Sequence, residues 1–441
     1  MVPFAPRPAE PEQNMDPAQK SDDPDDPDQQ SSAEAGAPLL ELPFPRAAPP
    51  LQSRAEQKLF TPAFVRLLGM QSASGFAFSM FFLLPKYLAT LGESPSRIGF
   101  VMGGFGVACI LTIPLLGPLV ARFGRRGALV AATSLLAAAA LTFALVPDPG
   151  VMAIPLRASE GVTWTIMFST ALALTAEIAP PDRLAQAIGL AGAASLIMNA
   201  VAPAIGEPLA DHFGYRSVFL LAAAAALAAA LLARRLIVAD PSAFSAHPTP
   251  KIASSVTSRA DERAGAPRLA MYVVFAVSGL AFSVLFTFLA PFALAHGVKA
   301  IRSFFIAYTA SALAVRILGG RLADRLGHRA IACRALLLYG CVVASTGLLG
   351  PHHLAVLGLL FGLAHGAVFP ALMALLIHLA PPARRPRILG IANGAMSVGI
   401  SSVFPAGMLV VRVGYPAMFA AAGVLVALSS TLLRKGGPLG R

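Results

Sequence analysis

Gly320-Arg321-Leu322-Ala323-Asp324-Arg325-Leu326-Gly327-His328-Arg329 is a short charged turn between two long apolar runs. A turn of the same form occurs earlier, as Gly117-Pro118-Leu119-Val120-Ala121-Arg122-Phe123-Gly124-Arg125-Arg126. The same 203 residues separate Gly117 from Gly320 and Gly124 from Gly327. Two copies of one turn, half a chain apart, indicate a duplicated bundle.

The composition indicates a membrane protein. Hydrophobic residues make up 56% of the chain and charged residues only 13%, whereas a soluble globular chain is about 25% charged. The net charge of +12 does not indicate nucleic acid, because the basic residues gather in alternate loops as membrane topology requires. The loops on one side hold 17 Lys and Arg against 6 on the other, so we expect the first side, with both termini, to be cytoplasmic.

Twelve apolar runs are long enough, or nearly so, to cross a bilayer, which takes about 20 residues in a helix. They are Phe64–Leu88, Ile98–Val120, Ala128–Val146, Val151–Ala176, Leu184–Leu209, Val218–Leu236, Leu269–Ala295, Phe304–Leu318, Ala330–Leu349, Leu354–Leu379, Ile388–Val411 and Pro416–Leu433. The sequence therefore predicts an all-α polytopic membrane protein with twelve transmembrane helices in two pseudo-symmetric six-helix bundles.

The predicted organisation has five parts. Residues 1–58, rich in Pro, Asp and Ser, form a disordered cytoplasmic tail, and residues 59–236 form the first bundle. A polar cytoplasmic linker, 237–268, leads to the second bundle, 269–434, and a cytoplasmic C-terminus, 435–441. Repeats that run in the same direction relate the bundles by an axis along the membrane normal.

The charged turns resemble the signature loop of the major facilitator superfamily, G-x-L-x-D-R-x-G-R-R. The second copy carries the match through Gly320, Leu322, Asp324, Arg325, Gly327 and Arg329. The first copy keeps Gly117, Leu119, Arg122, Gly124, Arg125 and Arg126, but has Ala121 where the family has Asp. The resemblance covers about residues 60–434 and implies a transporter whose signature loops control gating, with Asp324 as a one-sided contact between the halves.

Arg157 and Glu160 are charged residues deep in the fourth apolar run, three residues apart on one helical face. Charges inside a membrane are costly and usually functional. With Gly161 they resemble the family's R-x-x-Q-G pattern, which implies that Arg157 tunes the protonation of a nearby acid. We expect Glu160 to carry a proton during transport; a static ion pair that fixes helix packing is the alternative.

Further candidates lie along the same and neighbouring runs. His365 corresponds to Glu160 in the second half and either contacts substrate or makes an interhelical hydrogen bond. Trp164, four residues after Glu160, is expected to shield the pair from water, and Asn199 is a further cavity candidate. Phenylalanines could line an apolar cavity or pack against lipid; they are Phe76, Phe78, Phe81, Phe82 and Phe168.

Small residues in the fifth run resemble a worn form of the g-x-x-x-G-P-x-x-G-G pattern of drug antiporters in the superfamily. Pro203 and Gly206 match, whereas Ala202 and Glu207 replace glycines. The resemblance implies export, and ordinary helix packing through small residues is the alternative. Lys86, Glu177 and Glu207 lie near helix ends, where we expect interface anchoring.

The sequence thus predicts a monomeric secondary transporter in a bacterial inner membrane, working by alternating access. Its partners would be the lipid bilayer, protons and a small partly apolar organic substrate that is exported. Uptake or facilitated passage of a sugar or organic anion is an alternative, as is a non-transporting membrane sensor with the same fold. Neither a catalytic arrangement, a cofactor motif nor a metal-ligand cluster is found in the sequence, so we expect no enzyme activity, cofactor or metal.

Overall fold

The structure, a computed structural model, describes residues 59–146, 150–236, 259–380 and 384–435. The predicted tail, most of the linker and the last residues lie outside this part, as do some side chains within helices, among them those of residues 319–325. The described residues are helical and contain no strand, which confirms the all-α prediction.

The helices follow one another with short connections. In chain order they are α1 (Pro62–Met80), η2 (Phe81–Leu83), α2 (Leu84–Thr90), α3 (Pro95–Thr112), η3 (Ile113–Leu115), α4 (Leu116–Leu145), η4 (Gly150–Met152), α5 (Ala153–Ile178), η5 (Pro181–Arg183), α6 (Leu184–Phe213), α7 (Tyr215–Arg234), α8 (Arg259–Ala295), α9 (Arg302–Leu326), α10 (His328–Leu349), η7 (Pro351–His353), α11 (Leu354–Leu379), α12 (Arg385–Ser401) and α13 (Val403–Lys435).

Local sequence sets where two of these helices begin. Thr61 precedes Pro62, and its hydroxyl accepts a hydrogen bond from the Phe64 amide at 3.2 Å. Ser94 and Pro95 repeat the arrangement at α3. A hydroxyl before the helix satisfies an otherwise free amide, and proline suits the first helical position because its missing N–H has no partner there.

Nine helical stretches of the described chain are long and apolar enough to cross a membrane. Two of them, Pro95–Leu145 and Arg387–Leu433, each contain two of the predicted runs, and α9 falls outside the nine. The count of twelve spans therefore stays a prediction, although the predicted runs are helical apart from a few terminal residues.

The signature turns break the helices at equivalent glycines. Gly124 interrupts α4 with φ 67°, and Gly327 separates α9 from α10 with φ 80°. Only glycine adopts such angles without strain. The other glycines of positive φ also recur about 200 residues apart, in the pairs 92 and 297, 150 and 350, and 214 and 414. The backbone thus preserves the duplication where the sequence has diverged.

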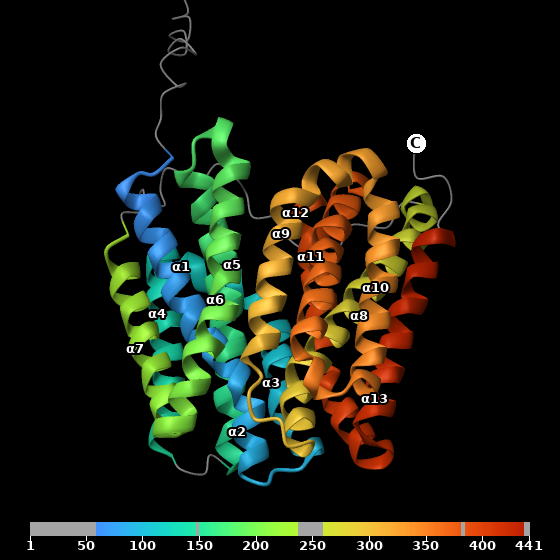
Figure 1. Ribbon diagram of the computed structural model, residues 1–441. Coiled ribbons are helices and arrows are strands. Elements are labelled where there is room, and N and C mark those ends of the chain that lie inside the picture. Colours follow the sequence, from blue (N-terminus) through green and yellow to red (C-terminus); the bar gives the residue numbers. More distant parts are fainter. Residues whose placement is uncertain (1–58, 147–149, 237–258, 381–383, 436–441) are drawn as a thin grey trace, which may run out of the picture. The chain divides into compact units, whose positions relative to one another are not determined.

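Helix packing repeats in the two halves. In the first, α4 packs against α5 and α7, α3 against α5, and α1 against α6 and α7. The second half repeats each contact, as α10 with α11 and α13, α9 with α11, and α8 with α12 and α13. Figure 1 shows α1 and α4–α7 on the left and α8–α13 on the right. The halves meet where α3 packs against α12 and α13, and where α6 packs against α9.

The two ends of the helices differ in how closely the halves meet. We call the end with the two signature turns the turn end, and the end with residues 84–97 and 295–302 the far end. Toward the far end, a Cβ on Gly99 would lie 2.8 Å from the Val403 carbonyl, and one on Gly407 2.5 Å from that of Pro95. At the turn end, a Cβ on Gly117 would meet nothing outside its own helix within 4 Å. The halves are therefore in closest contact toward the far end.

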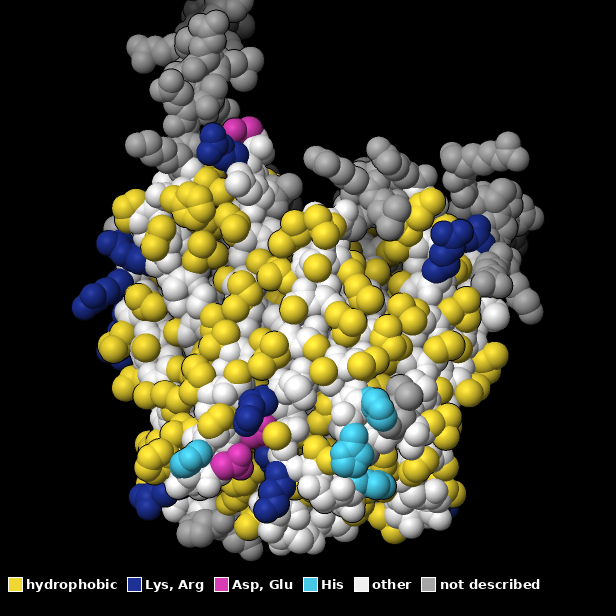
Figure 2. Space-filling model, in the orientation of Figure 1, with side chains coloured by type: hydrophobic (Ala, Val, Ile, Leu, Met, Phe, Trp, Pro, Cys, Tyr) yellow, Lys and Arg dark blue, Asp and Glu magenta, His cyan; other side chains and the backbone are white. Residues whose placement is uncertain are grey.

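The surface is apolar between two polar margins. Figure 2 shows hydrophobic side chains spread over the middle of the visible face, with Lys, Arg, Asp, Glu and His side chains toward its upper and lower ends. Many large apolar side chains are exposed, including Leu111, Leu227 and Leu348. Such a surface suits lipid, because contiguous apolar patches of this kind are rare on soluble monomers.

Close packing of α10 on α13 generates a prediction about stability. A Cβ on Gly340 would lie 2.5 Å from the Gly423 carbonyl oxygen, so Gly340→Ala should destabilise the protein by about 1–3 kcal/mol through overpacking. Gly390→Ala in α12 is the control, because a Cβ there meets nothing within 4 Å. Thermal unfolding in detergent should show a lower Tm for the first variant alone. Equal Tm values would contradict this packing.

Candidate functional site

A small cavity lies between the two halves, and both contribute to its wall. The first half provides Phe78, Phe82, Met102, Phe105 and Arg157, and the second provides Phe282, Ser283, Phe286, Thr287 and Ile400. The cavity volume is about 40 Å³, enough for a few water molecules, whereas drug-sized ligands occupy roughly 300–1,000 Å³. The halves must therefore move before an organic molecule can fit.

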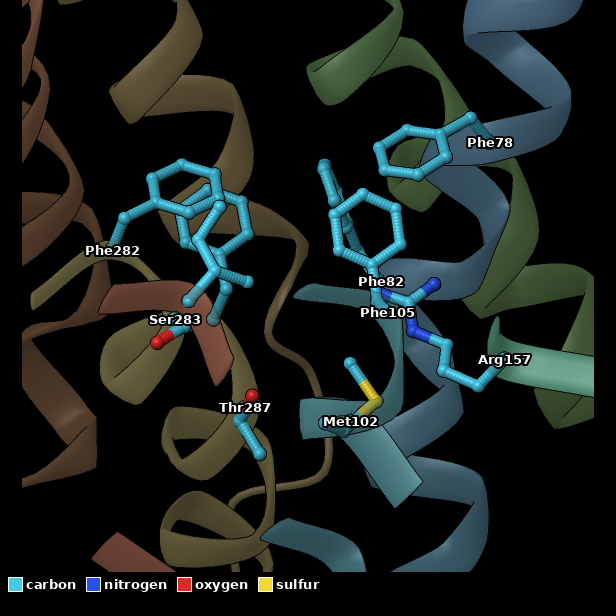
Figure 3. A pocket seen from close by; sticks show the side chains of 10 residues that line it. Phe78, Phe82, Met102, Phe105, Arg157, Phe282, Ser283 and Thr287 are labelled. Atoms are coloured by element: carbon cyan, nitrogen blue, oxygen red, sulfur yellow. The ribbon is translucent and has the colours of Figure 1, made fainter. Parts of the chain in front are cut away.

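The wall is aromatic, with polar groups at three places. Figure 3 shows Phe282, Ser283 and Thr287 across the cavity from Phe78, Phe82 and Arg157. The ring of Phe82 lies 4.9 Å from that of Phe286, edge to face, so aromatic side chains of the two halves are in direct contact. The site combines apolar surface with one guanidinium group and two hydroxyl groups.

Arg157 and Glu160 form a buried ion pair on α5, the fourth predicted span. The Arg157 guanidinium donates from Nη1 to Glu160 Oε2. Arg157 is 5% exposed and Glu160 is fully buried. The guanidinium also lies 4.8 Å from the centre of the Phe105 ring and 5.9 Å from that of Phe78, in the cation–π arrangement. The pair thus reaches the cavity through Arg157.

The pair leaves two polar atoms without a hydrogen bond. Within the described residues, Arg157 Nε and Glu160 Oε1 are buried and have no partner. Unsatisfied buried polar atoms cost on the order of 1–3 kcal/mol each, more where a charge is involved. Arg157 Nε can therefore donate one further hydrogen bond, and Glu160 Oε1 can accept one or take up a proton.

Trp164 and Phe168 extend an aromatic row along α5. The Trp164 ring stacks on Phe78 at 4.6 Å and on Phe168 at 5.7 Å. Phe78 in turn lies over the guanidinium of Arg157, so Trp164 is one ring away from the ion pair. Phe168 is 45% exposed and does not line the cavity.

The other predicted aromatic residues divide between cavity and core. Phe78 and Phe82 line the cavity, whereas Phe81 is fully buried against Phe143 and Phe219. Phe76 is partly buried and packs against the main hydrophobic core, which includes residues of both halves.

Sequence reasoning missed the aromatic wall of the second half. Phe282 and Phe286 stand four residues apart on α8, with ring centroids at 4.1 Å. They follow Phe78 and Phe82 by the same 204 residues, an offset within the range of the paired glycines. The repeat itself was therefore a signal that could have identified them.

His365 lies in a separate buried cluster of the second half. Its Nδ1 is 3.2 Å from the Tyr308 hydroxyl, and its ring stacks on Phe361. Phe282 lies 5.2 Å away and separates His365 from the cavity. The structure thus places His365 in an interhelical hydrogen bond, one ring from the site.

The remaining predicted residues of the first half lie at helix contacts. Asn199 accepts a hydrogen bond from Ser79 at 2.8 Å, which joins α6 to α1. A Cβ on Gly161 would lie 2.3 Å from the Phe105 carbonyl oxygen, and one on Gly206 2.8 Å from a methionine sulfur in α1. Pro203 lies inside α6. None of these four lines the cavity.

The signature turns make contacts within their own halves. Arg125 forms an ion pair with Glu177 at the end of α5, which the sequence had suggested as an interface anchor. Arg329 donates from Nε to the Leu433 carbonyl oxygen at 2.7 Å. The side chains of Asp324 and Arg325, and the surroundings of Gly320, are outside what the structure describes, so the gating contact of Asp324 stays a prediction.

Lys86 and Glu207 are not interface anchors, and that expectation was wrong. Lys86 is 3% exposed and Glu207 is fully buried, and their side chains meet at 2.5 Å. The two residues are 121 positions apart, so no local spacing revealed the pair. Each neutralises the other, which allows both charges to leave water.

A metal centre is not evident in the described part of the chain, where no three His, Cys, Asp or Glu side chains gather.

Comparison with known proteins identifies the fold. The sequence matches the family model of the Major Facilitator Superfamily over residues 67–351 and 271–438. A crystal structure of a mutant of the nucleoside transporter NupG is similar with a TM-score of 0.69 and 13% sequence identity, covering 85% of this chain and 100% of that one. A mutant of the peptide transporter POT, in complex with sulfate, matches with a TM-score of 0.71 and 14% identity, over 86% and 95% of the two chains.

The stacked ring of Trp164 generates a prediction that needs no substrate. Trp164 is the single tryptophan of the chain, so its emission reports on the site alone. Phe78→Ala removes the ring stacked on it and should shift the emission to longer wavelength, because water gains access. Phe275→Leu in the second half, where Phe275 contacts Phe369, should leave the spectrum unchanged. Identical shifts in both variants would contradict the stacking.

Proposed function

The chain belongs to the Major Facilitator Superfamily, and on that premise we propose that it is a proton-coupled secondary transporter that exports a small, partly apolar organic molecule by alternating access. The observation that carries this proposal is the buried Arg157–Glu160 pair, which meets a cavity between the two halves.

Alternating access requires a binding site that both halves form and that opens to each side of the membrane in turn. The cavity meets this condition, because its wall is divided between α1, η2, α3 and α5 on one side and α8 and α12 on the other. The halves touch closely toward the far end, so rocking them about the cavity would close one end as the other opens.

The ion pair supports coupling to protons. When Arg157 turns toward a ligand, Glu160 loses its counter-charge in a fully buried position. An unpaired charge inside a membrane protein is strongly unfavourable. A proton is the smallest species that can neutralise the carboxylate, and the free Oε1 offers it a place. Substrate contact and protonation are thereby linked.

The wall of the cavity supports a partly apolar substrate. Four of its ten residues, all on the first side, are aromatic or carry a guanidinium group, and the second side adds Phe282 and Phe286. Phenyl rings favour an apolar or planar body, and Arg157, Ser283 and Thr287 offer donors that would fix its orientation.

The argument for export comes from helix α6. Its Pro203 and Gly206 follow the pattern of drug antiporters, and Gly206 lies in tight contact with α1, which supports export. Uptake of an organic anion is the alternative, and Arg157 in the wall is the observation that favours it. The similar structures are named as nucleoside and peptide transporters, and those substrates are their own.

The membrane setting follows from the same proposal. We place the chain in a bacterial inner membrane, and the bias of Lys and Arg between the loops supports an orientation with the turn end and both termini in the cytoplasm. We further propose that the chain acts as a monomer in the lipid bilayer, with two bundles joined by residues 237–268.

Replacement of Glu160 tests the proposal in proteoliposomes that contain purified protein. A panel of lipophilic cations, organic anions and sugars is applied while proton flux and substrate flux are measured. Glu160→Gln should lower substrate-driven proton flux by roughly tenfold or more, because the glutamine amide, unlike a carboxylate, cannot take up and release a proton. The matched control is Asp182→Asn, which removes an exposed carboxylate just after the same helix.

A second variant separates coupling from folding. Arg157→Gln with Glu160→Gln removes both charges and leaves none unpaired, so this double variant should fold and still fail to move protons. Substrate transport without proton flux in the wild type would instead establish a facilitator. Absence of any transport across the panel would favour a sensor with the same fold.

A further inference from the structure

Glu207 bridges the two halves at the far end. It lies on α6 in the first half, near Lys86 of α2. The loop before α9 brings the first residues of that helix, in the second half, against the same carboxylate. Transport chemistry at Arg157 and Glu160 makes no use of this buried acid, which needs a role of its own.

The carboxylate accepts hydrogen bonds on both oxygens. Oε1 accepts from Lys86 Nζ at 2.5 Å and from the Ile301 amide at 2.9 Å. Oε2 accepts from the Ile301 amide at 3.0 Å and from the Arg302 amide at 2.9 Å. Glu207 is fully buried, and unlike Glu160 it has no unsatisfied oxygen among the described residues.

The partner in the second half is the start of a long helix. Helix α9 runs for 25 residues from Arg302, and the first amides of a helix lack partners within it. The helix dipole adds partial positive charge at the same end. Hydrogen bonds from amides to an ionised carboxylate are stronger than neutral ones, so Glu207 holds this end of α9 firmly.

Only some of the hydrogen bonds of Glu207 would break when the two halves move apart. Lys86 belongs to the same half as Glu207 and would travel with it. Ile301 and Arg302 belong to the other half and would be left behind, with water in place of the carboxylate. Opening at the far end therefore breaks only the amide contacts, and the charge pair stays intact as a unit.

We infer that Glu207, held by Lys86, is the latch that keeps the far end closed by capping the start of α9. Its contact sets the balance between the conformation closed at the far end and the one closed at the turn end. The inference rests on the proposed alternating access, but it involves neither the substrate nor the proton. Glu207 stands where the antiporter pattern has glycine, so the latch is a feature of this chain.

Distances between spin labels test the latch in lipid nanodiscs. In a background without Cys109, Cys333 and Cys341, one pair of labels spans the halves at the far end, on Thr90 and Lys299. A second pair spans them at the turn end, on Arg126 and Arg334. All four positions are exposed. Double electron–electron resonance then gives the population of each conformation.

Glu207→Gln should raise the population open at the far end by roughly tenfold, because a charge-assisted bond becomes a neutral one. The distance at the turn end should shorten in the same molecules. A merely structural role would broaden both distances without this reciprocal change, and that result would overturn the inference.

Arg302 provides a matched pair of variants that leave both buried charges in place. Arg302→Pro removes one of the two amides that donate to Glu207, at the first helical position, where proline is tolerated. Arg302→Ala removes the exposed side chain and keeps the amide. The proline variant should raise the population open at the far end several-fold, about 3–10-fold, and the alanine variant should leave it unchanged. Equal effects of the two variants would refute the latch.

These outcomes are independent of the proposed function. Distances report the latch even if no substrate is found, and Glu160→Gln should leave them unchanged in the absence of substrate. Loss of proton coupling with an intact latch would reject the function alone. Normal coupling with unaltered distances in Glu207→Gln would reject the latch alone.

Discussion

Charges that leave water must be compensated where they lie, and Glu160 and Glu207, two buried acids of the described residues, are compensated in opposite ways. Glu207 has partners for both oxygens, in a lysine and the first amides of α9. Among the described residues, Glu160 has one hydrogen-bond partner, Arg157, and its Oε1 has none. Complete compensation fixes a group in place, whereas incomplete compensation leaves it ready to exchange. Complete compensation suits a structural contact, and incomplete compensation suits a site that exchanges its partners.

The structure around these acids reflects the internal duplication of the chain. Glycines with positive φ recur in four pairs about 200 residues apart, and the aromatic residues that meet in the cavity recur at the same spacing. Glycine persists in the turns because no other residue adopts the backbone angles without strain. Elsewhere side chains were free to diverge, so the halves share a backbone plan while the ion pair and the aromatic row of Trp164 belong to the first half.

Sequence reasoning reached what local spacing determines. The helical runs follow from their apolar length, and the signature turns from a repeat at 203 residues. The shared face of Arg157 and Glu160 follows from their spacing of three residues. The Lys86–Glu207 pair joins residues 121 positions apart, and its third partner is a set of backbone amides, which leaves no trace in side-chain identity. Phe282 and Phe286 could have been predicted as cavity residues, because their offset from Phe78 and Phe82 is visible in the sequence. His365 had the right offset, yet packing placed it one ring from the cavity.

The counterpart of Glu207 in the second half is Gly407, 200 residues later, and there the halves meet backbone to backbone, with Gly407 against the Pro95 carbonyl. One edge of the closure is thus held by directional bonds that resist pulling apart. The other is a close approach of two backbones, with the rings of Phe100 and Phe404 in edge-to-face contact beside it. Opening at the far end would therefore have two different costs, since the α6–α9 edge exchanges its hydrogen bonds for water whereas the α3–α13 edge gives up close van der Waals packing.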